Sequence, residues 1–445
     1  MLLRNGDVMS KLKILSTYLK FKFRPKFKSR QDFETWQHKQ VVNFLTKIVP
    51  KSPFYSKQFQ GKSFEDWKNF PTIDKTSMMA NFDQLNTVGA SKEEALEIAF
   101  TSESDRNFSR MYKNIVVGLS SGTSGNRGLF LVSTEESDFW TGAILAKALP
   151  DFITKKQKIA FFFRANSKLY ETVKSKNLQF HYFDLLDRMK NHIQRLAELQ
   201  PTIIISPPSM LREIAKYCEN GLKINPKKII SVAEVLDPID EKYLEAKFGQ
   251  KIYQIYQCTE GFLGVSCNHG TVHLNEDVLA IQKEYLDEAK TKFMPIITDF
   301  RRTSQPIIRY KLNDILTEKK SPCKCGSVFT ALECIEGRMD DIFIFPATNG
   351  GEDILIFPDF FRRAIIFAHD QINAYQATQI SKELVKIYLD CPETLFKQIC
   401  NNISEHLARI FTQMNCIHPK LEFIHSIPQP TTWVKMKRII RQFKT

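Results

Sequence analysis

Five short apolar runs, separated by amphipathic stretches, constrain the fold of this chain more than any other feature. The runs are NIVVGL at 114–119, KIAFFF at 158–163, TIIIS at 202–206, KKIISV at 227–232 and KIYQIYQ at 251–257. Helical periodicity lies between them, at 192–199 and at 209–218. Buried strands that alternate with helices are typical of a largely parallel sheet covered by helices. We therefore predict an α/β fold for the middle of the chain.

The last hundred residues have a different pattern. After GRMDDIFIF at 337–345 come a turn-rich loop, a helix around 360–369, a strand at 383–389 and a helix around 395–414. The chain has 445 residues, whereas a typical domain has roughly 100–200. We therefore predict a large multi-layer domain with mixed sheets and helices over 1–339, and a small α+β domain over 340–445.

The charge of the chain is strongly positive. Sixty-three Lys and Arg residues against 49 Asp and Glu residues give a formal charge of +14, which suits an anionic partner such as a nucleotide, a coenzyme or a membrane surface. Part of the excess is local, because residues 11–30 include eight basic residues and no acidic one. We interpret this segment as solvated, with weak membrane-surface contact as the alternative.

The cysteines and the apolar runs indicate the cellular location. Nine cysteines, an odd number, are scattered along the chain, and lysines interrupt the apolar residues near the amino terminus, so no secretion signal is expected. A disulfide scaffold is not expected either. No apolar run approaches the ~18 residues that a membrane span needs. The predicted location is the cytoplasm.

A loop rich in glycine and hydroxyl residues interrupts two β-type runs in VVGLSSGTSGNRGLFLVS at 116–133. Glycines let the backbone approach a polyphosphate, amides and hydroxyls donate to its oxygens, and an arginine adds charge. The spacing matches neither the Walker loop nor the dinucleotide motif. An ordinary Gly/Ser hairpin is the alternative. The predicted nucleotide contacts are Ser120, Ser121, Gly122, Thr123, Ser124, Gly125 and Arg127.

This loop resembles the phosphate-binding signature of the adenylate-forming superfamily, which comprises the acyl-CoA synthetases and their relatives. YQCTEG at 256–261 resembles the aromatic-x-x-Thr-Glu motif of that superfamily. The resemblance implies that Tyr256 stacks on adenine, that Thr259 contacts phosphate and that Glu260 holds Mg²⁺. A carboxylate is a hard ligand of the kind that Mg²⁺ prefers.

Two later segments resemble further motifs of the superfamily in the same order. PIIRYKLNDIL at 306–316 resembles the ribose-binding segment IRYRTGD and implies that Asp314 binds the ribose hydroxyls, although Leu312 and Asn313 replace its usual Thr-Gly. IEGRMDD at 335–341 resembles the hinge motif. It implies that Arg338 points toward the nucleotide and that Asp340 is the pivot of a small, mobile carboxyl-terminal domain.

The tail TTWVKMKRIIR at 431–441 resembles the motif that supplies the adenylation lysine. The alignment implies that Lys435 is this lysine and that Arg438 is the arginine of the motif. Because Val434 replaces the usual glycine, Lys437 remains a rival. In addition, SVAEVLD at 231–237 resembles the segment ahead of the adenine pocket, which makes Glu234 a further nucleotide-site candidate.

The closer resemblance is to one branch, the phenylacetate-CoA ligases and the capsule-biosynthesis-like proteins. It rests on SPFYSKQF at 52–59, FPTIDKTSMMANFD at 70–83 and CKCGSVFTALECIEGRMDD at 323–341. Members of this branch often carry a structural zinc ion. The resemblance implies a tetrahedral zinc site formed by Cys267, His273, Cys323 and Cys325. His269 is the alternative to His273 as the histidine ligand.

The resemblance implies a reaction in which Mg·ATP activates a carboxylic acid as its acyl-AMP and pyrophosphate leaves. Coenzyme A is then the expected acceptor, and an acyl carrier protein, an amine or no acceptor are alternatives. Thirty-five phenylalanines favour an apolar or aromatic acid. No nucleic-acid partner is expected, and the oligomeric state stays open, a dimer included. A hypothesis of another class is a non-enzymatic, basic, zinc-containing module that binds nucleic acid or a membrane through residues 11–30.

Overall fold

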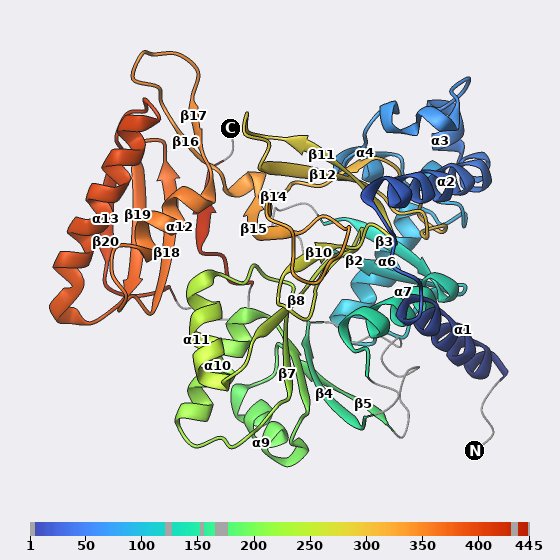
Figure 1. Cartoon of the computed structure of the whole chain (residues 1–445), viewed down its shortest axis with the longest axis horizontal. Helices are drawn as coiled ribbons and strands as arrows, with labels where there is room; N and C mark the ends of the chain where they lie inside the picture. The colour runs from blue at the N-terminus through green and yellow to red at the C-terminus, as the bar shows by residue number, and fades with distance from the viewer. Residues whose placement is uncertain (1–4, 121–126, 152–154, 165–176, 429–434, 444–445) are drawn as a thin grey trace. The chain divides into compact units, whose positions relative to one another are not determined.

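The computed structural model describes residues 5–120, 127–151, 155–164, 177–428 and 435–443 (Figure 1). The chain divides into two compact units. Unit 1 consists of Met1–Ala233, Lys247–Leu312 and Leu316–Cys334, and unit 2 consists of Glu234–Ala246, Asn313–Ile315 and Ile335–Thr445. Short segments from the middle of the chain therefore join the carboxyl-terminal residues in unit 2.

Helices form the amino-terminal part of unit 1, and side-chain caps begin several of them. Ser29 accepts from the backbone N–H of Asp32, and Asp74 from that of Ser77, which satisfies donors that the first helical turn leaves free. The helices are α1 (Asn5–Lys22), α2 (Arg30–Ile48), η1 (Val49–Lys51), α3 (Pro53–Gln58), η2 (Phe64–Asn69), α4 (Lys75–Ala80), α5 (Phe82–Leu85) and α6 (Lys92–Ser104).

A seven-stranded sheet in the order β10-β9-β8-β7-β6-β4-β5 forms the centre of unit 1. Strands β5, β4, β6, β7 and β8 are parallel, and β9 and β10 are antiparallel. The strands are β4 (Gln157–Phe163), β5 (Leu178–Asp184), β6 (Ile203–Ser206), β7 (Lys228–Val232), β8 (Ile252–Cys258), β9 (Gly261–Ser266) and β10 (Val272–Leu274). The helices along this part of the chain are α7 (Thr134–Ala148), α9 (Met189–Leu199), α10 (Pro208–Glu219) and α11 (Pro238–Phe248).

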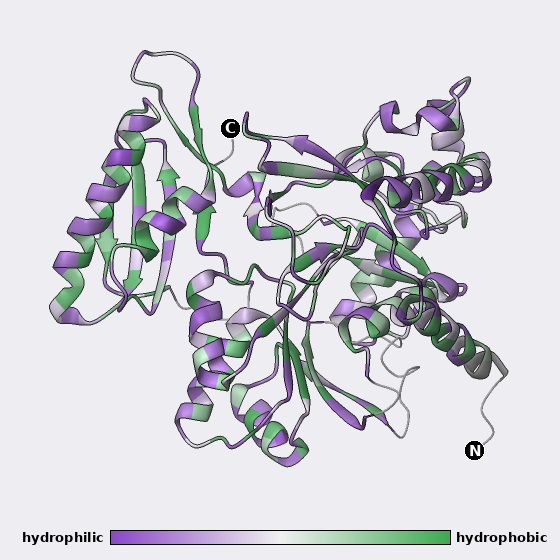
Figure 2. Ribbon diagram, in the orientation of Figure 1, coloured by the Kyte–Doolittle hydropathy of each residue, from purple (hydrophilic) through white to green (hydrophobic). Residues whose placement is uncertain are grey.

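The predicted α/β class is confirmed, and four of the five apolar runs form parallel strands of this sheet. The run at 114–119 is the exception, because it forms β2 of a separate antiparallel sheet. That sheet contains β1 (Met111–Tyr112), β2 (Ile115–Leu119) and β3 (Leu129–Ser133). Figure 2 shows hydrophobic colouring along the central strands and mixed colouring on the helices. This contrast is expected for strands buried on both faces.

A five-stranded sheet has the order β11-β12-β14-β15, with β13 paired to β12. Its strands are β11 (Ala280–Tyr285), β12 (Lys292–Thr298), β13 (Tyr310–Lys311), β14 (Asp314–Glu318) and β15 (Leu332–Arg338). A parallel bridge joins Ile73 to Tyr310, and the Ile73 carbonyl accepts from the N–H of Lys311 at 2.7 Å. These bonds hold the start of α4 beside β13.

Unit 2 contains a four-stranded sheet in the order β20-β19-β18-β21 and a β16-β17 hairpin. Its core includes Phe343, Phe345, Phe361 and Phe411, each at most 1% exposed. The predicted helix, strand and helix of this region are confirmed as α12, β19 and α13. The elements are η3 (Met339–Asp341), β16 (Phe343–Phe345), β17 (Ile354–Ile356), α12 (Pro358–Ile366), β18 (Ala374–Ser381), β19 (Leu384–Asp390), α13 (Glu393–Gln413), β20 (Lys420–Ile424) and β21 (Ile439–Arg441).

The basic segment at 11–30 is more ordered than a solvated tail. It forms most of α1, which packs against α7, and Ile14 and Tyr18 are buried there. The two arginines that follow α1 bind buried carboxylates: Arg24 lies 2.5 Å from Asp277, and Arg30 lies 2.7 Å from Glu276. The interpretation as a solvated segment therefore holds only in part: Arg24 and Arg30 have internal partners, which a charge count does not reveal, whereas Lys11, Lys20, Lys26 and Lys28 are exposed. Among the described helices, none has the length and apolar character needed to cross a membrane.

Candidate functional site

The carboxylate of Glu260 lies at a tight turn of unit 1. Cys258 pairs with Gly261 across the β8-β9 hairpin, so that Thr259 and Glu260 are the two turn residues. Glu260 is only 8% exposed. The Thr259 hydroxyl donates to Oε2 at 2.8 Å, and the Tyr310 hydroxyl donates to Oε1 at 3.0 Å. Both carboxylate oxygens therefore have a hydrogen-bond donor.

These donors keep Glu260 ionised although it is buried. Burial by itself would raise the pKa of this carboxyl. Hydrogen bonds from Thr259, Cys258 and Tyr310 oppose that effect, and the positive charge of Lys75 adds to them. Together they bring the pKa of Glu260 below its ordinary value. A buried carboxylate that is charged at neutral pH is suited to a divalent cation such as Mg²⁺.

Arg302 and Gln305 fix the turn relative to β3. The buried Arg302 donates through Nη1 to the Thr259 carbonyl at 2.5 Å and through Nη2 to Gln305 Oε1 at 3.0 Å. The same oxygen of Gln305 accepts from the backbone N–H of Leu131 at 2.9 Å. Because β3 follows the glycine-rich loop directly, these bonds place the end of that loop and the Glu260 turn in one rigid part of unit 1.

Only the two ends of the glycine-rich loop belong to the described residues. The predicted contacts Ser121, Gly122, Thr123, Ser124 and Gly125 lie outside them. Ser120 closes the base of the loop, because its N–H donates to the Gly128 carbonyl and its Oγ accepts from the Gly128 N–H, both at 2.8 Å. Arg127, the predicted phosphate ligand, forms a two-bond ion pair with Glu103 and donates to the Ser120 carbonyl at 3.0 Å.

Two residues of this region were not identified from the sequence, namely Lys75 and Tyr310. Lys75 begins α4, and a Cβ atom added to Gly128 would lie 3.4 Å from its Cε atom. Its charge acts on Glu260, so it is a candidate phosphate-binding cation. Both residues occur in segments that resemble the family, at 70–83 and 306–316, which was the available signal. Tyr256, the predicted adenine-stacking residue, lies on β8 and is 8% exposed.

The ribose and hinge candidates lie close together in unit 2. Arg338 Nε is 3.4 Å from Asp314 Oδ1. The Asn313 side chain donates to Asp340 Oδ2 at 3.0 Å, and the Met339 N–H donates to the Asn313 carbonyl at 2.8 Å. Asn313, which replaces the usual glycine of the ribose motif, therefore binds the hinge candidate through its side chain.

The tail motif is also anchored within unit 2. Lys437 Nζ lies 2.9 Å from Asp341 Oδ1. Arg438 is buried and forms two bonds with Asp240, at 2.6 and 3.2 Å. Glu234, a predicted nucleotide-site residue, accepts from the Met436 N–H at 3.0 Å. Lys435 directly precedes these contacts and is partly exposed.

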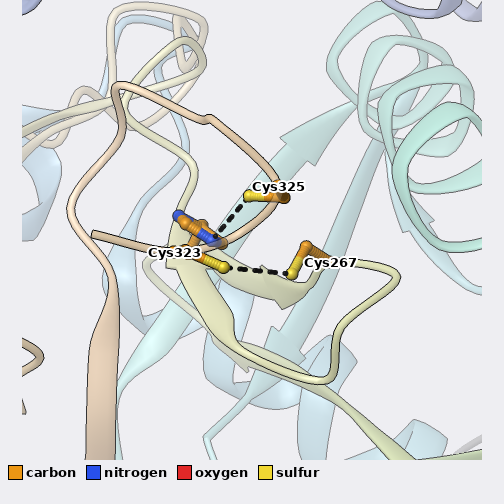
Figure 3. A group of neighbouring side chains, drawn as sticks. Cys267, Cys323 and Cys325 are labelled. Atoms are coloured by element: carbon orange, nitrogen blue, oxygen red, sulfur yellow. Dashed lines mark hydrogen bonds between the residues drawn. The ribbon is translucent and has the colours of Figure 1, made fainter. Parts of the chain in front are cut away.

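Cys267, His273, Cys323 and Cys325 form a second site within unit 1. Their ligand atoms all lie within 4.8 Å of one another. Cys267 follows β9, His273 lies on β10, and the last two cysteines lie in the loop between β14 and β15. The Sγ atoms of Cys267 and Cys323 are 3.7 Å apart and point toward each other (Figure 3). Cys325 Sγ lies 3.3 Å from Nε2 of His273.

The surroundings of the cluster suit a zinc ion. His273 Nδ1 lies 3.2 Å from the Phe329 carbonyl, an arrangement that fixes the ring and directs Nε2 at the cysteines. Burial alone would raise the pKa of Cys323, but hydrogen bonds from the Cys325 backbone and from His273 bring it to about 6. Three thiols and an imidazole are a donor set that zinc prefers. The group contains His273 and does not contain His269.

Two curated proteins are similar to this chain in sequence. Indoleacetate–lysine synthetase of Pseudomonas savastanoi is 25% identical over 230 residues, which are 49% of this chain and 57% of that protein. Protein CapK of Staphylococcus aureus is 24% identical over 283 residues, which are 61% of this chain and 59% of that protein. The chain thus spans less than two thirds of the length of these relatives. No family model matches the chain.

Solved structures of similar fold span nearly the whole chain. A 2-hydroxyisobutyryl-CoA ligase in complex with 2-HIB-AMP, in the postadenylation state, has a TM-score of 0.67 and 16% identity, with 95% of this chain and 94% of that chain covered. The GH3.15 acyl acid amido synthetase has a TM-score of 0.55 and 15% identity, with 88% and 86% covered. The fold that the sequence resemblance implies is therefore confirmed. The likeness to CapK is consistent with the capsule-biosynthesis-like branch, and the phenylacetate-CoA ligase-like subtype remains a prediction.

Proposed function

We propose that this chain, which has the fold of adenylate-forming ligases, is a member of that superfamily and activates a carboxylic acid with ATP. The acid carboxylate attacks the α-phosphorus, the bond to the pyrophosphate oxygen breaks, and an acyl-AMP mixed anhydride forms. The observation that carries this proposal is the turn at Glu260. There a buried carboxylate is kept charged by Thr259 and Tyr310, with Lys75 close enough to act on its pKa.

The roles of the individual residues follow from this chemistry. A Mg²⁺ ion held by Glu260 would offset negative charge on the phosphates of ATP. Thr259, Lys75 and the glycine-rich loop would bind phosphate oxygens. In unit 2, we assign Asp314 to the ribose and Lys435 to the charge that develops as pyrophosphate leaves. No general base is required, because the attacking carboxylate is already ionised.

The acceptor of the acyl group separates two candidate functions. Coenzyme A is the acceptor that the branch resemblance implies, and the product would be a thioester. An amine is the second candidate, and the likeness to indoleacetate–lysine synthetase favours it. In both cases the acceptor replaces AMP on the acyl carbon, so the first half-reaction is the same. An acyl carrier protein remains a third possibility of the same chemistry, and an apolar or aromatic acid is the proposed substrate class.

Exchange of labelled pyrophosphate into ATP tests the first half-reaction, because it requires an acid that the protein adenylates but no acceptor. Aryl, indolyl and aliphatic acids would be screened one by one. We expect acid-dependent exchange that is lost in Glu260→Ala, while Glu65→Ala, at an exposed site of unit 1, keeps it. No exchange with any acid would favour the non-enzymatic binding module. Mass spectrometry with coenzyme A or lysine added would then identify thioester or amide products.

We also propose a structural zinc ion at Cys267, His273, Cys323 and Cys325. The cluster ties the turn after β9 and strand β10 to the loop between β14 and β15, which are far apart in the sequence. Zinc bound there would cross-link these segments, which is the usual role of a closed site with four protein ligands. No step of the proposed reaction depends on this metal.

A further inference from the structure

One face of α1 exposes an unusual number of large apolar side chains. Counted along the helix they are three or four residues apart, a spacing that places side chains on one side of an α-helix. The backbone N–H of Phe23 donates to the Leu19 carbonyl at 2.9 Å, so the helical bonding continues to this residue. The exposed fractions are 57% for Met9, 56% for Leu12, 40% for Leu15, 39% for Leu19 and 71% for Phe23.

The opposite face of α1 is fixed to the body of unit 1. Ile14 and Tyr18 are buried against α7, and the Tyr18 hydroxyl donates to the Pro150 carbonyl at 2.5 Å. Phe21 packs edge-on against Phe139, with ring centroids 5.7 Å apart. Figure 1 shows α1 lying alongside α7. The helix therefore has a rigid attachment on one side and an apolar surface on the other.

Lysines border the apolar face on both sides. Lys11 and Lys22 are three helical turns apart and share one border, and Lys13 and Lys20 are about two turns apart and share the other. Lys13 is paired with Glu135 of α7 at 2.6 Å, and Lys22 donates to the Pro150 carbonyl at 2.6 Å. Lys11 and Lys20 are exposed, so these two lysines are the ones available to an outside partner. After the helix, Lys26 and Lys28 are exposed as well.

We propose that this face of α1, defined by Met9, Leu12, Leu15, Leu19 and Phe23, docks on the surface of an anionic membrane. The apolar side chains enter the boundary between headgroups and acyl chains, and Lys11 and Lys20 contact lipid phosphates. A second copy of this chain fits less well, because a two-fold contact through this face would bring the lysine borders of both copies together. Docking here would hold unit 1 at the membrane, beside apolar acids dissolved in the bilayer.

Flotation of the full chain with lipid vesicles tests this proposal. We expect the protein to float with phosphatidylcholine vesicles that contain phosphatidylglycerol, and to float about tenfold less with pure phosphatidylcholine or at high salt. Leu12→Glu/Leu19→Glu should abolish flotation, and Lys11→Glu/Lys20→Glu should reduce it about tenfold. Phe367→Glu, at a 74% exposed apolar site of unit 2, is the control and should float normally. Circular dichroism would check that each variant remains folded.

Two results from flotation and light scattering would overturn the proposal. One is that the unsubstituted protein fails to float with the anionic vesicles, or floats no better than Leu12→Glu/Leu19→Glu. The other is that this double variant converts an oligomer into a monomer by light scattering, in which case the face is a contact between copies. As an independent signal, Phe23→Trp should show blue-shifted emission and loss of quenching by iodide when anionic vesicles are added. An unchanged spectrum with floating protein would place the membrane contact elsewhere.

Discussion

The hydroxyl of Tyr310 donates a 3.0 Å hydrogen bond to Oε1 of Glu260. Burial, and then the charge of Glu260, raise the pKa of this phenol far above its usual value. The Tyr310 hydroxyl therefore stays protonated at neutral pH and can donate this bond. The bond is one of the interactions that hold Glu260 ionised. The charge of the proposed magnesium ligand at the β8-β9 turn therefore depends on a residue of β13, which belongs to a different sheet.

Replacing Tyr310 with Phe should raise the pKa of Glu260 and lower stability. The depressed pKa contributes stability that is present above the ordinary glutamate pKa and is lost as pH falls through the folded-state value. We expect Tyr310→Phe to lose about 1.5–3 kcal/mol at pH ~7, with a smaller difference in acid. The acid limb of pyrophosphate exchange should move to higher pH. Denaturant titrations and a pH–rate profile would measure both.

Tyr285→Phe is the matched control, because Tyr285 is 39% exposed and should change neither property. If Tyr310→Phe lost the same stability at neutral and acid pH, the effect would be one of packing and not of the charge on Glu260. An unchanged acid limb of the pH–rate profile would mean that ionisation of Glu260 does not control the rate of pyrophosphate exchange.

The two lysines of the tail should behave differently when replaced by alanine. Lys437 is bound to Asp341, so Lys437→Ala should cost about 1 kcal/mol of stability, as for other partly exposed ion pairs, and leave exchange largely intact. Lys435→Ala should lower exchange about 100- to 1,000-fold, the usual cost of removing one group that stabilises transition-state charge. Exchange rates and unfolding free energies of both variants test this. The reverse ranking of activities would transfer the catalytic role to Lys437.

Local patterns predicted much of the fold because they report burial directly. Ile203, Ile204 and Ile205 form a continuous apolar run, and β6 is buried on both faces. The apolar run at 114–119 has the same sequence pattern, but it forms β2, which lies between β1 and β3 in an antiparallel sheet. Its neighbours are set by tertiary contacts, and periodicity carries no information about them.

The candidate site was predictable only where a motif named its residues. Thr259 and Glu260 are adjacent in one motif. Lys75 and Tyr310 come from distant segments, which the bridge between Ile73 and Tyr310 brings together. No spacing in the sequence encodes that bridge. For the zinc cluster, the sequence motifs identified the ligand residues. Only the fold shows that these residues lie together, because Cys267 and Cys323 are 56 residues apart in the sequence.

Metal analysis should find zinc bound to the purified protein. We expect about one zinc ion per chain, reduced to near zero in Cys323→Ser and in His273→Ala, with a lower unfolding temperature in both. Cys218→Ser, outside the cluster, is the control and should keep the metal. A strong chelator should lower the unfolding temperature of the unsubstituted protein and not that of Cys323→Ser. Purified protein that binds no zinc when zinc is supplied during refolding would contradict the site.

The buried carboxylate of Asp277 should make the stability of unit 1 dependent on pH. It lies 2.9 Å from Lys147 and 2.5 Å from Arg24. Burial alone would raise the pKa of Asp277, but the charges of Lys147 and Arg24 bring it below the ordinary value. Stability from these pairs is therefore present above the ordinary aspartate pKa and is lost as pH falls through the lowered pKa.

Asp277→Asn should cost about 2–4 kcal/mol at neutral pH, because it leaves two partly buried cations without their partner. Asp151→Asn, whose pair with Lys155 is exposed, should cost close to nothing. Urea titrations at neutral pH and in acid would compare them, and the deficit of Asp277→Asn should shrink in acid. Equal stability of Asp277→Asn and the unsubstituted protein at neutral pH would mean that the arginine after α1 does not hold this helix to the body of the protein.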